Sequence, residues 1–271
     1  MVSATEILKI NASETKALIL EFLRKLIEES GADGYVLGLS GGVDSSVVAK
    51  LCVEAVGRKK VLGLFMPSDT TPQEDALDAE RFASMLGIEY EVIDITSISD
   101  YLANICKHGL QASVLARGNI KPRVRMTLLY YHANILNMLV AGTGNRSELL
   151  IGYYTKYGDG GVDCLPIGNL YKTQVRQLAE HLGIPSSIIW KTPTAGLWKG
   201  QTDEDEIGLK YEQLDLLLYY LCDLGMDVEA ASKLVNIQTE LAKNILTRIK
   251  RSEHKRRPIP IPPIPTPLTR R

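Results

Sequence analysis

The residues that could do chemistry begin in the stretch LGLSGGVDSS, residues 37–46, where two adjacent glycines and Asp44 stand between an apolar run and a helix-like segment. Adjacent glycines after a strand let the backbone turn tightly and bring its amide groups close to a ligand. The positive end of the following helix adds to the attraction for anions. The loop is therefore expected to bind phosphate. Its spacing matches neither GxxxxGK[ST] nor GxGxxG, so the chemistry of those two motifs is not assumed.

Asp44 is not explained by anion binding alone, because a carboxylate repels phosphate oxygens unless a divalent cation lies between them. Mg²⁺ typically binds one or two carboxylates together with phosphate oxygens. The alternative is that Asp44 caps the helix with its short acceptor side chain. Glu148 ends a second glycine-rich stretch, GTGNRSE (142–148), at a strand end where ligands of open α/β sheets gather. This second carboxylate favours a metal site formed by Asp44 and Glu148.

The elements that must position these residues alternate between strand and helix. Helical spacing of apolar residues covers 5–29, and Gly31 and Gly34 close that segment. Thr71, Pro72 and Glu74 predict a capped helix start, with Thr71 as the cap and Glu74 completing a capping box. The alternation predicts an α/β fold with a doubly wound, mostly parallel sheet and helices on both faces. The predicted strands are 35–39, 61–66, 90–95 and 138–141, and the later helices are 45–56, 73–86, 124–137 and 173–182.

The chain is interpreted as one domain over residues 1–271. N-terminal helices occupy 1–30, a nucleotide-binding α/β core 34–190, a lid and C-terminal helical region 191–257, and a proline-rich tail 258–271. The segment from Ala195 to Glu206 combines glycines, a tryptophan and acids, so it could order over ligands and exclude water. An ordinary mobile surface loop has a similar composition, and that alternative stays open.

Composition excludes several function classes. Charges nearly cancel, with 31 basic against 32 acidic residues, so nothing in the balance points to nucleic acid or a membrane. No stretch is apolar for long enough to cross a bilayer. The four cysteines lie far apart without a CxxC pair and are expected to be buried free thiols. These features predict a cytoplasmic protein.

Longer stretches carry a specific resemblance. SGGVDSS resembles the pyrophosphate loop of ATP pyrophosphatases, enzymes that split ATP between its α and β phosphates. The resemblance to ammonia-dependent NAD synthetases covers residues 34–258 and rests on GNIKPRVRM (118–126), GTGNRSE, YYTKYGDGGVDCLPIGNLYKTQVR (153–176), KTPTAGLWKGQTDEDEIGLKYEQLD (191–215) and EHKRRP (253–258). It implies a Rossmann-like fold of the adenine nucleotide α-hydrolase type. The implied reaction is ATP-dependent amidation of nicotinic acid adenine dinucleotide (deamido-NAD) by ammonia. NAD, AMP and pyrophosphate are formed through an adenylated carboxylate, with Mg²⁺ as cofactor.

The same resemblance implies roles for individual residues. Asp44, Lys172 and Asp163 would be catalytic, and Asp44 and Glu148 would bind Mg²⁺. The implied ATP-binding residues are Gly38, Leu39, Ser40, Gly41, Gly42, Val43, Asp44, Ser45, Thr143, Lys172 and Thr194. The implied deamido-NAD-binding residues are Arg123, Lys156, Asp163, His254 and Lys255.

Two of these assignments leave alternatives open. Sequence spacing does not decide whether Arg123 or Arg125 faces the substrate. Asp163 could orient a donor, bind the pyridinium or the entering ammonium, or accept a proton.

The resemblance also implies a homodimer, with the apolar helices before residue 30 at the interface or, alternatively, covering the sheet. The chain is too short for the glutaminase domain of larger family members, so free ammonia or a separate glutaminase is the expected nitrogen source. The rival functions are another ATP pyrophosphatase, such as a GMP synthetase core or a tRNA thiolase, and a non-catalytic adenine-nucleotide sensor.

Overall fold

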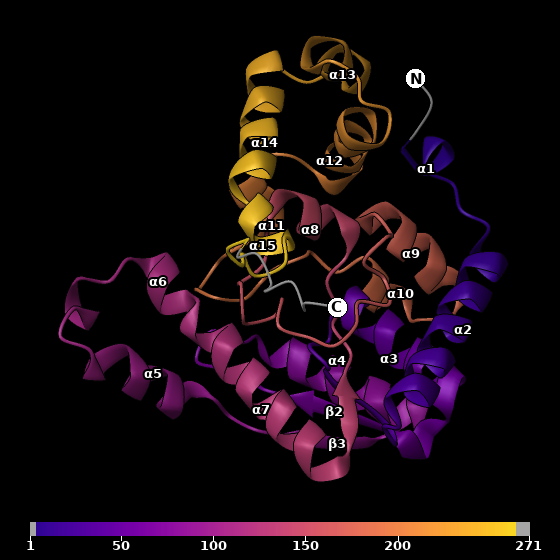
Figure 1. Ribbon diagram of the computed structural model, residues 1–271, viewed down its shortest axis with the longest axis vertical. Helices are drawn as coiled ribbons and strands as arrows, with labels where there is room; N and C mark the ends of the chain where they lie inside the picture. The colour runs from indigo at the N-terminus through magenta and orange to yellow at the C-terminus, as the bar shows by residue number, and fades with distance from the viewer. Residues whose placement is uncertain (1–3, 264–271) are drawn as a thin grey trace, which may run out of the picture.

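A four-stranded parallel sheet of order β3-β2-β1-β4 forms the centre of the computed structural model, which describes residues 4–263 (Figure 1). Tyr35 of β1 lies opposite Val61 of β2 on one side and Leu139 of β4 on the other. The chain therefore leaves β1 in one direction and later crosses to its other side. Such a switch opens a crevice at the carboxyl ends of β1 and β4. The strands are β1 (Gly34–Gly38), β2 (Val61–Phe65), β3 (Glu89–Val92) and β4 (Met138–Val140).

Helices cover both faces of the sheet. Along β1, Tyr35 and Leu37 pack into one apolar cluster while Val36 packs into another, and all three are fully buried. A strand buried on both faces explains why this stretch reads as a continuous apolar run. The helices of the first face are α2 (Ala12–Ser30), α3 (Val43–Val56), α4 (Gln73–Leu86) and α9 (Lys172–His181), and α7 (Ile120–Leu136) covers the second. The predicted doubly wound α/β fold is confirmed.

The N-terminal segment forms a short helix, α1 (Ala4–Ile7), followed by α2. Asn11 caps α2 by accepting a hydrogen bond from the Glu14 amide, and Gly31 ends it with a φ of 68°. Ile19, Leu20 and Leu23 pack into the core of the first face. Within the chain, this segment therefore covers the α/β core, which was one of the two alternatives. Leu18 and Phe22 stay exposed on its outer side.

The predicted capping box at Thr71 is wrong. Helix α4 begins at Gln73, with Pro72 in the cap position and no side-chain cap. The Thr71 hydroxyl instead accepts a hydrogen bond from the Ser68 amide at 2.9 Å. This local turn holds Thr71 away from the helix, which is why the spacing to Glu74 produced no box.

The C-terminal helices form a second apolar unit above the sheet (Figure 1). Their buried side chains include Leu214, Leu217, Ala231 and Ile245. The helices are α12 (Tyr211–Leu218), a π-helical turn (Tyr219–Asp223), α13 (Val228–Val235) and α14 (Thr239–Arg251). Short helices lie between this unit and the sheet: α8 (Arg146–Ile151), α10 (Ser186–Ile189), α11 (Asp203–Ile207) and α15 (Glu253–Arg256). Residues 258–263 are exposed without regular structure, and the rest of the predicted tail lies outside the described residues.

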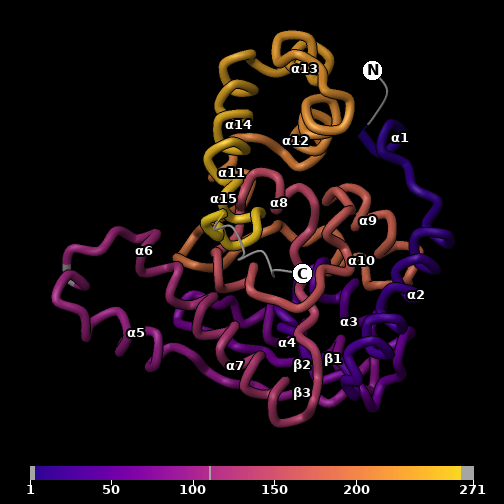
Figure 2. The backbone as a smooth tube through the Cα atoms, viewed as in Figure 1, coloured from indigo at the N-terminus to yellow at the C-terminus, as the bar shows by residue number. Residues whose placement is uncertain are grey.

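An arm extends from the body between β3 and α7 (Figure 2). It is formed by α5 (Thr96–Ile105) and α6 (Val114–Gly118), and α5 packs along α7. Ile98, Tyr101 and Ile105 of α5 are exposed. Two 3₁₀ turns, Arg58–Lys60 and Gly109–Gln111, complete the elements of the described chain. No helix within residues 4–263 is long and apolar enough to span a membrane.

Candidate active site

The loop after β1 forms one wall of a cavity of about 780 Å³ at the carboxyl ends of the strands. Gly41 has a φ of 81°, and a Cβ at this position would lie 2.5 Å from the backbone oxygen of Asp75. Only glycine fits this conformation and this close approach. The Ser45 hydroxyl donates to the Gly42 carbonyl at 3.0 Å and accepts from the Ser40 amide at 3.2 Å. The sequence thus builds a tight, cross-linked turn that leads into α3.

Asp44 does not cap α3, because Gly42 occupies the cap position and has no side chain to accept a bond. Instead, Asp44 forms an ion pair with Lys172 and accepts a hydrogen bond from the Asn145 side chain at 3.0 Å. The loop after β1, the loop after β4 and the first residue of α9 meet at this carboxylate. The capping alternative for Asp44 is therefore not the observed arrangement.

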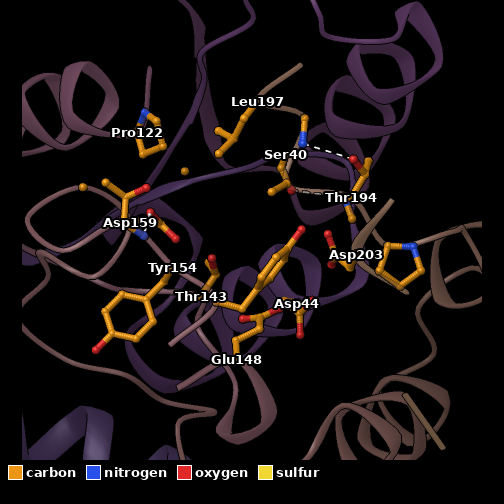
Figure 3. Close-up of a pocket in the computed structure, with 18 of the residues that line it drawn as sticks. Ser40, Asp44, Pro122, Thr143, Glu148, Tyr154, Asp159, Thr194, Leu197 and Asp203 are labelled. Atoms are coloured by element: carbon orange, nitrogen blue, oxygen red, sulfur yellow. Dashed lines mark hydrogen bonds between the residues drawn. The ribbon is translucent and has the colours of Figure 1, made fainter. Parts of the chain in front are cut away.

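Glu148 lies beside this pair in the first turn of α8 (Figure 3). It forms a capping box with Asn145, in which each side chain bonds the backbone amide of the other, at 3.1 and 3.2 Å. Burial raises the pKa of Glu148 well above its usual value, and the neighbouring Asp44 carboxylate raises it further. Two neighbouring carboxylates are both ionised only when positive charge lies near them, and Lys172 supplies such a charge here.

Asp203 is a third carboxylate at the same end of the cavity (Figure 3), and sequence reasoning assigned it no role. Its side chain is only 4% exposed, and it accepts a hydrogen bond from the Tyr211 hydroxyl at 3.2 Å. Its Oδ1 atom is buried and has no partner within the described part of the chain. Burial raises the pKa of Asp203, while the nearby Lys172 ammonium lowers it. An unpaired buried oxygen of this kind is rare in proteins and is usually explained by a missing ligand or a functional role.

The single lysine among these carboxylates is Lys172, whose side chain is 4% exposed. Burial disfavours its charge, but Asp44, Glu148 and Asp203 outweigh that effect and raise the pKa of the ammonium. The Lys172 nitrogen also lies 5.2 Å from the centroid of the Tyr211 ring. Three acids therefore face one base at this end of the cavity.

Asp215 of α12 holds the first turns of α8 and α9, which carry Glu148 and Lys172. Sequence reasoning also missed this residue. The Asp215 carboxylate accepts from the Ser147 hydroxyl at 2.5 Å and from the Thr173 amide at 2.8 Å. The Ser147 hydroxyl in turn accepts from the Lys172 amide at 3.0 Å. Asp215 is fully buried, and burial raises its pKa to about 6. This network fixes Glu148 and Lys172 relative to one another.

The donor set fits Mg²⁺ bound together with phosphate. Oxygen atoms of Asp44 and Glu148 are the hard ligands that Mg²⁺ prefers, and it normally completes its shell with water and phosphate oxygens. Within residues 4–263, no group of three or more His, Cys, Asp or Glu side chains could hold an ion by itself. The protein part of the site is therefore an open pair of carboxylates rather than a closed cage.

The structure brings together most residues predicted to bind ATP. The residues that line the cavity are Gly38, Leu39, Ser40, Gly42, Val43, Asp44, Ser45, Thr143, Lys172 and Thr194. Gly41 does not line it but shapes the turn. The Thr194 hydroxyl donates to the Gln201 carbonyl at 2.8 Å, so it also organises its own loop.

The residues predicted to bind deamido-NAD divide into two groups. His254 and Lys255 line the cavity. Arg123 and Lys156 lie outside it, where Arg123 donates to the Lys156 carbonyl and Lys156 donates to the His254 carbonyl, at 3.3 and 2.9 Å. Asp163 is also outside, and its carboxylate accepts from the Tyr130 hydroxyl at 2.9 Å and the Val140 amide at 2.7 Å.

Arg125, rather than Arg123, faces the cavity. Its Nε donates to the Met66 carbonyl at 3.0 Å, and burial lowers its pKa. The Asp159 carboxylate lies close enough to oppose that lowering. Asp159 is on the cavity wall (Figure 3), and burial raises the pKa of its carboxyl. The second end of the cavity thus combines Arg125 and Asp159 with Lys255, which donates to the carbonyls of Gly152 and Tyr154.

The segment 195–206, predicted to be a lid, lies over the cavity and contributes Leu197, Gln201 and Asp203 to its wall. Two contacts fasten it to the loop before α4 and to α7. The Thr70 hydroxyl donates to the Gly196 carbonyl at 2.7 Å, and Lys121 donates to the Leu197 carbonyl at 3.2 Å. Further along the segment, Gln201 donates to the Tyr153 hydroxyl at 3.2 Å, and Glu206 accepts from that hydroxyl at 2.9 Å. Polar contacts along its length therefore hold the segment in place.

The cysteines only partly match expectation. All four are free, and Cys52 and Cys164 are buried, but Cys106 and Cys222 are exposed. Burial raises the pKa of Cys164 to about 12 and that of Cys52 well above its usual value. None of the four lines the cavity, so the structure offers no thiol for sulfur transfer there.

Comparisons with known proteins agree with this geometry. Residues 16–259 match the family model described as NAD synthase. An NH(3)-dependent NAD(+) synthetase of Hyperthermus butylicus is 49% identical over 268 residues, which cover 98% of this chain and 95% of that protein. Two solved structures superpose closely. The NMN synthetase of Francisella tularensis has a TM-score of 0.81 at 34% identity, covering 94% of this chain and 100% of that one. The NH3-dependent NAD synthetase of Campylobacter jejuni, in complex with the nitrate ion, has a TM-score of 0.77 at 30% identity, covering 93% and 99%. With the family model matching residues 16–259 and a relative 49% identical over nearly the full length, this chain belongs to the NAD synthase family.

Proposed function

We propose that the protein is an ammonia-dependent NAD synthetase, which amidates deamido-NAD at the expense of ATP and releases NAD, AMP and pyrophosphate. The observation that carries this proposal is the convergence of the phosphate loop, Asp44, Glu148 and Lys172 in one cavity. The near full-length relatives named NH(3)-dependent NAD(+) synthetase support it.

The chemistry needs activation because a carboxylate resists attack by ammonia and oxide does not leave. A carboxylate oxygen of the substrate attacks the α-phosphorus of ATP, and the bond to pyrophosphate breaks. Ammonia then attacks the acyl carbon of the adenylate, the bond to AMP breaks, and the new amide loses a proton. Negative charge accumulates on the phosphate oxygens in the first step, so groups that stabilise this charge supply most of the catalysis.

Each residue at the acidic end has a role in that step. The amides of the loop 38–42 and the N-terminus of α3 hold phosphate oxygens. Lys172 neutralises charge on the departing pyrophosphate as a compact cation. Asp44 and Glu148 would hold Mg²⁺, which supplies further charge stabilisation at the phosphates when bound. The segment 195–206 excludes water, which would otherwise hydrolyse the adenylate.

Deamido-NAD would reach the reaction centre from the opposite end of the cavity, where His254 and Lys255 lie. Arg123, Lys156 and Asp163 keep their proposed role in binding the same substrate from the rim, and we propose that a second subunit brings them into a complete site.

A homodimer is consistent with the exposed apolar residues of α5 and α7, among them Tyr101, Ile105 and Tyr131. Sedimentation of the purified protein tests this assembly.

The nitrogen source and the location follow from the same proposal. Free ammonia, or ammonia released by a separate glutaminase, enters the reaction. The four free cysteines fit a reducing, cytoplasmic compartment.

A turnover assay tests the proposal. Purified protein is mixed with ATP, Mg²⁺, deamido-NAD and either ammonium or glutamine, and NAD, AMP and pyrophosphate are measured. We expect the three products in equal amounts with ammonium and no NAD with glutamine alone. Asp44→Asn should stay folded and lose most turnover, because the carboxylate that meets Lys172 and the proposed metal is removed. ATP binding without AMP formation would favour a nucleotide sensor and overturn the proposal.

A second substrate deserves a direct comparison because one solved neighbour is named an NMN synthetase. The same chemistry on the deamido mononucleotide would give NMN. Parallel measurements of kcat/KM on the mononucleotide and the dinucleotide decide between the two. We expect the dinucleotide to be preferred, in keeping with the curated relatives at 45% to 50% identity.

A further inference from the structure

The polar face of α14 forms a wall of the cavity that no role described above uses. Asn244, Thr247, Arg248 and Arg251 all line the cavity, and their spacing of three, four and seven residues places them on one side of a helix. The opposite side carries Ala242 and Ile245, which pack into the C-terminal apolar unit. The end of α14 lies against α8 and α15 (Figure 1). The helix therefore turns hydrogen-bond donors, two of them cationic, toward the ligand space.

Arg248 and Arg251 have no anionic partner within residues 4–263, whereas the donors of Arg256 and Arg257 are engaged. Arg256 donates to the carbonyls of Leu149 and Leu150 at 2.9 and 2.7 Å, and Arg257 pairs with Glu253 at 2.5 Å. For Arg248 the described contact is with a ring, since its guanidinium carbon lies 5.3 Å from the centroid of Tyr153. Such stacking fixes the plane of a guanidinium and leaves its edge free to bind an anion.

The acids near this wall are already engaged. Glu206 accepts hydrogen bonds from the Tyr153 hydroxyl at 2.9 Å and from Gln201 at 2.8 Å. Positive charge is also crowded here. Burial lowers the pKa of Lys255, Asp159 opposes this, and Arg248, Arg123 and Arg256 lower it further. Cations that repel one another around a cavity are stabilised when an anion binds between them.

Two anionic ligands enter this cavity under the proposed function. The loop 38–42 and Lys172 serve the phosphates of ATP, whereas the diphosphate of the dinucleotide has no cation reserved for it inside the cavity. Lys255 cannot fully supply one, because its ammonium donates to the carbonyls of Gly152 and Tyr154 at 2.6 and 2.5 Å. Arg125 also lines the cavity, but Asp159 lies near its guanidinium and favours its charged form. Arg248 and Arg251 have free donors and no acid beside them within the described residues, and arginine binds phosphate oxygens through paired hydrogen bonds.

We propose that Arg248 and Arg251 form a phosphate subsite on α14 that holds a phosphate group of a bound substrate. The diphosphate of the dinucleotide is the source that the arrangement favours, and the terminal phosphates of ATP are the other. The identity of the ligands rests on the proposed function, whereas the existence of the subsite does not.

The simpler explanation of these arginines is that basic residues in the last turn of a helix interact with its negative end. Lys250 provides a matched control, because it belongs to the same last turn and is exposed but does not line the cavity. Lys250→Gln removes the same charge from the same helix end. If the two arginines form a phosphate subsite, Arg248→Gln and Arg251→Gln weaken ligand binding and Lys250→Gln does not.

Binding is measured by calorimetry on the full chain, separately with ATP and Mg²⁺, deamido-NAD, the deamido mononucleotide and inorganic pyrophosphate. We expect Arg248→Gln to raise the Kd of at least one of these ligands about tenfold, Arg251→Gln to raise the same Kd, and Lys250→Gln to change it less than about twofold. Circular dichroism and thermal midpoints verify that each variant is folded. Arg248→Lys should recover part of the loss, because it restores charge without the paired donors.

The ligands separate the two sources of phosphate. A loss confined to deamido-NAD assigns the subsite to the dinucleotide, and a loss for ATP and pyrophosphate assigns it to the polyphosphate. Unchanged affinities for all four ligands in both arginine variants, or an equal loss in Lys250→Gln, would overturn the subsite. Turnover by the wild-type protein is a separate readout, so a failure of the proposed function would be recognised independently.

Discussion

Replacing Asp215 by Asn tests whether this buried carboxylate positions the catalytic cluster or only stabilises the fold. The side chain accepts hydrogen bonds from Ser147 at 2.5 Å and from the Thr173 amide at 2.8 Å. An amide of the same shape keeps only one acceptor, so one of these donors loses its partner. An unpaired buried donor costs about 1–3 kcal/mol. The same substitution removes a buried charge, which acts in the opposite direction.

The size of that second effect follows from the pKa. Burial raises the pKa of Asp215 from its ordinary value of 3.8 to about 6. Because the folded pKa lies above the unfolded one, this group's stabilising contribution is fully present at low pH and is lost as pH rises through about 6. At pH 7 the ionised carboxylate therefore costs roughly 3 kcal/mol relative to a neutral group. The two effects nearly cancel, so Asp215→Asn should have close to wild-type stability at pH 7.

Activity should not be preserved in the same variant. Asp215 holds the first turn of α9 and, through Ser147, the first turn of α8, which carry Lys172 and Glu148. Small displacements of groups that contact phosphate lower rates strongly. We expect kcat to fall about tenfold or more while the free energy of unfolding at pH 7 changes by under about 1 kcal/mol.

Urea unfolding at pH 5 and pH 7, together with steady-state kinetics, measures both parts. When the pH falls from 7 to 5, the free energy of unfolding of the wild type should rise by about 1 kcal/mol relative to that of Asp215→Asn. The reason is that only the wild type has a titrating carboxyl at position 215. Glu212→Gln, on the same helix but with an exposed carboxylate paired to Arg176, should change kcat little. A pH-independent difference in stability, or a variant with normal kcat, would refute the reasoning.

Three other predictions concern the walls of the cavity. Asp203→Asn should raise the thermal midpoint, since it removes a buried charge whose Oδ1 has no partner within the described residues, and it should lower kcat; a drop in midpoint would contradict this. Gly41→Ala should destabilise the protein by roughly 1–3 kcal/mol in urea unfolding, because its φ is 81° and the new Cβ would lie 2.5 Å from the Asp75 carbonyl. Lys121→Ala removes the contact to the Leu197 carbonyl, so protease should cut the segment 195–206 faster; an unchanged cleavage rate would show that this contact does not hold the segment.

Local patterns were sufficient to predict the sheet and the tight glycine turn that follows β1. All four strands were predicted to within about three residues at each end. For β1 and β2, which are buried, the continuous apolar run gave the signal. β3 is largely exposed, and its position followed from the alternation of strand and helix. The capping box at Thr71 failed for a local reason as well. Its hydroxyl found a nearer donor in the Ser68 amide, and composition does not reveal such competition between turn and helix.

The remaining site residues depend on tertiary contacts that have no sequence signal. Asp215 lies 42 residues from its partner Thr173, and no motif marks it. Asp203 is the first residue of α11, where an acidic side chain is favoured without any functional role. Its position beside Lys172 follows only from the path of the segment 191–207. Whether Arg123 or Arg125 faces the cavity depends on how α7 is rotated about its axis. Two arginines two residues apart do not reveal that rotation in the sequence.

The central claim is that Asp44 and Glu148 bind a divalent cation together with the phosphates of ATP. The most direct measurement is a crystal structure of the protein with a non-hydrolysable ATP analogue and Mn²⁺, whose anomalous scattering locates the ion. We expect a peak that touches both carboxylates and the phosphate oxygens, with Lys172 turned toward the phosphates. An ion bound away from both carboxylates, or an analogue whose phosphates avoid the loop 38–42, would contradict it.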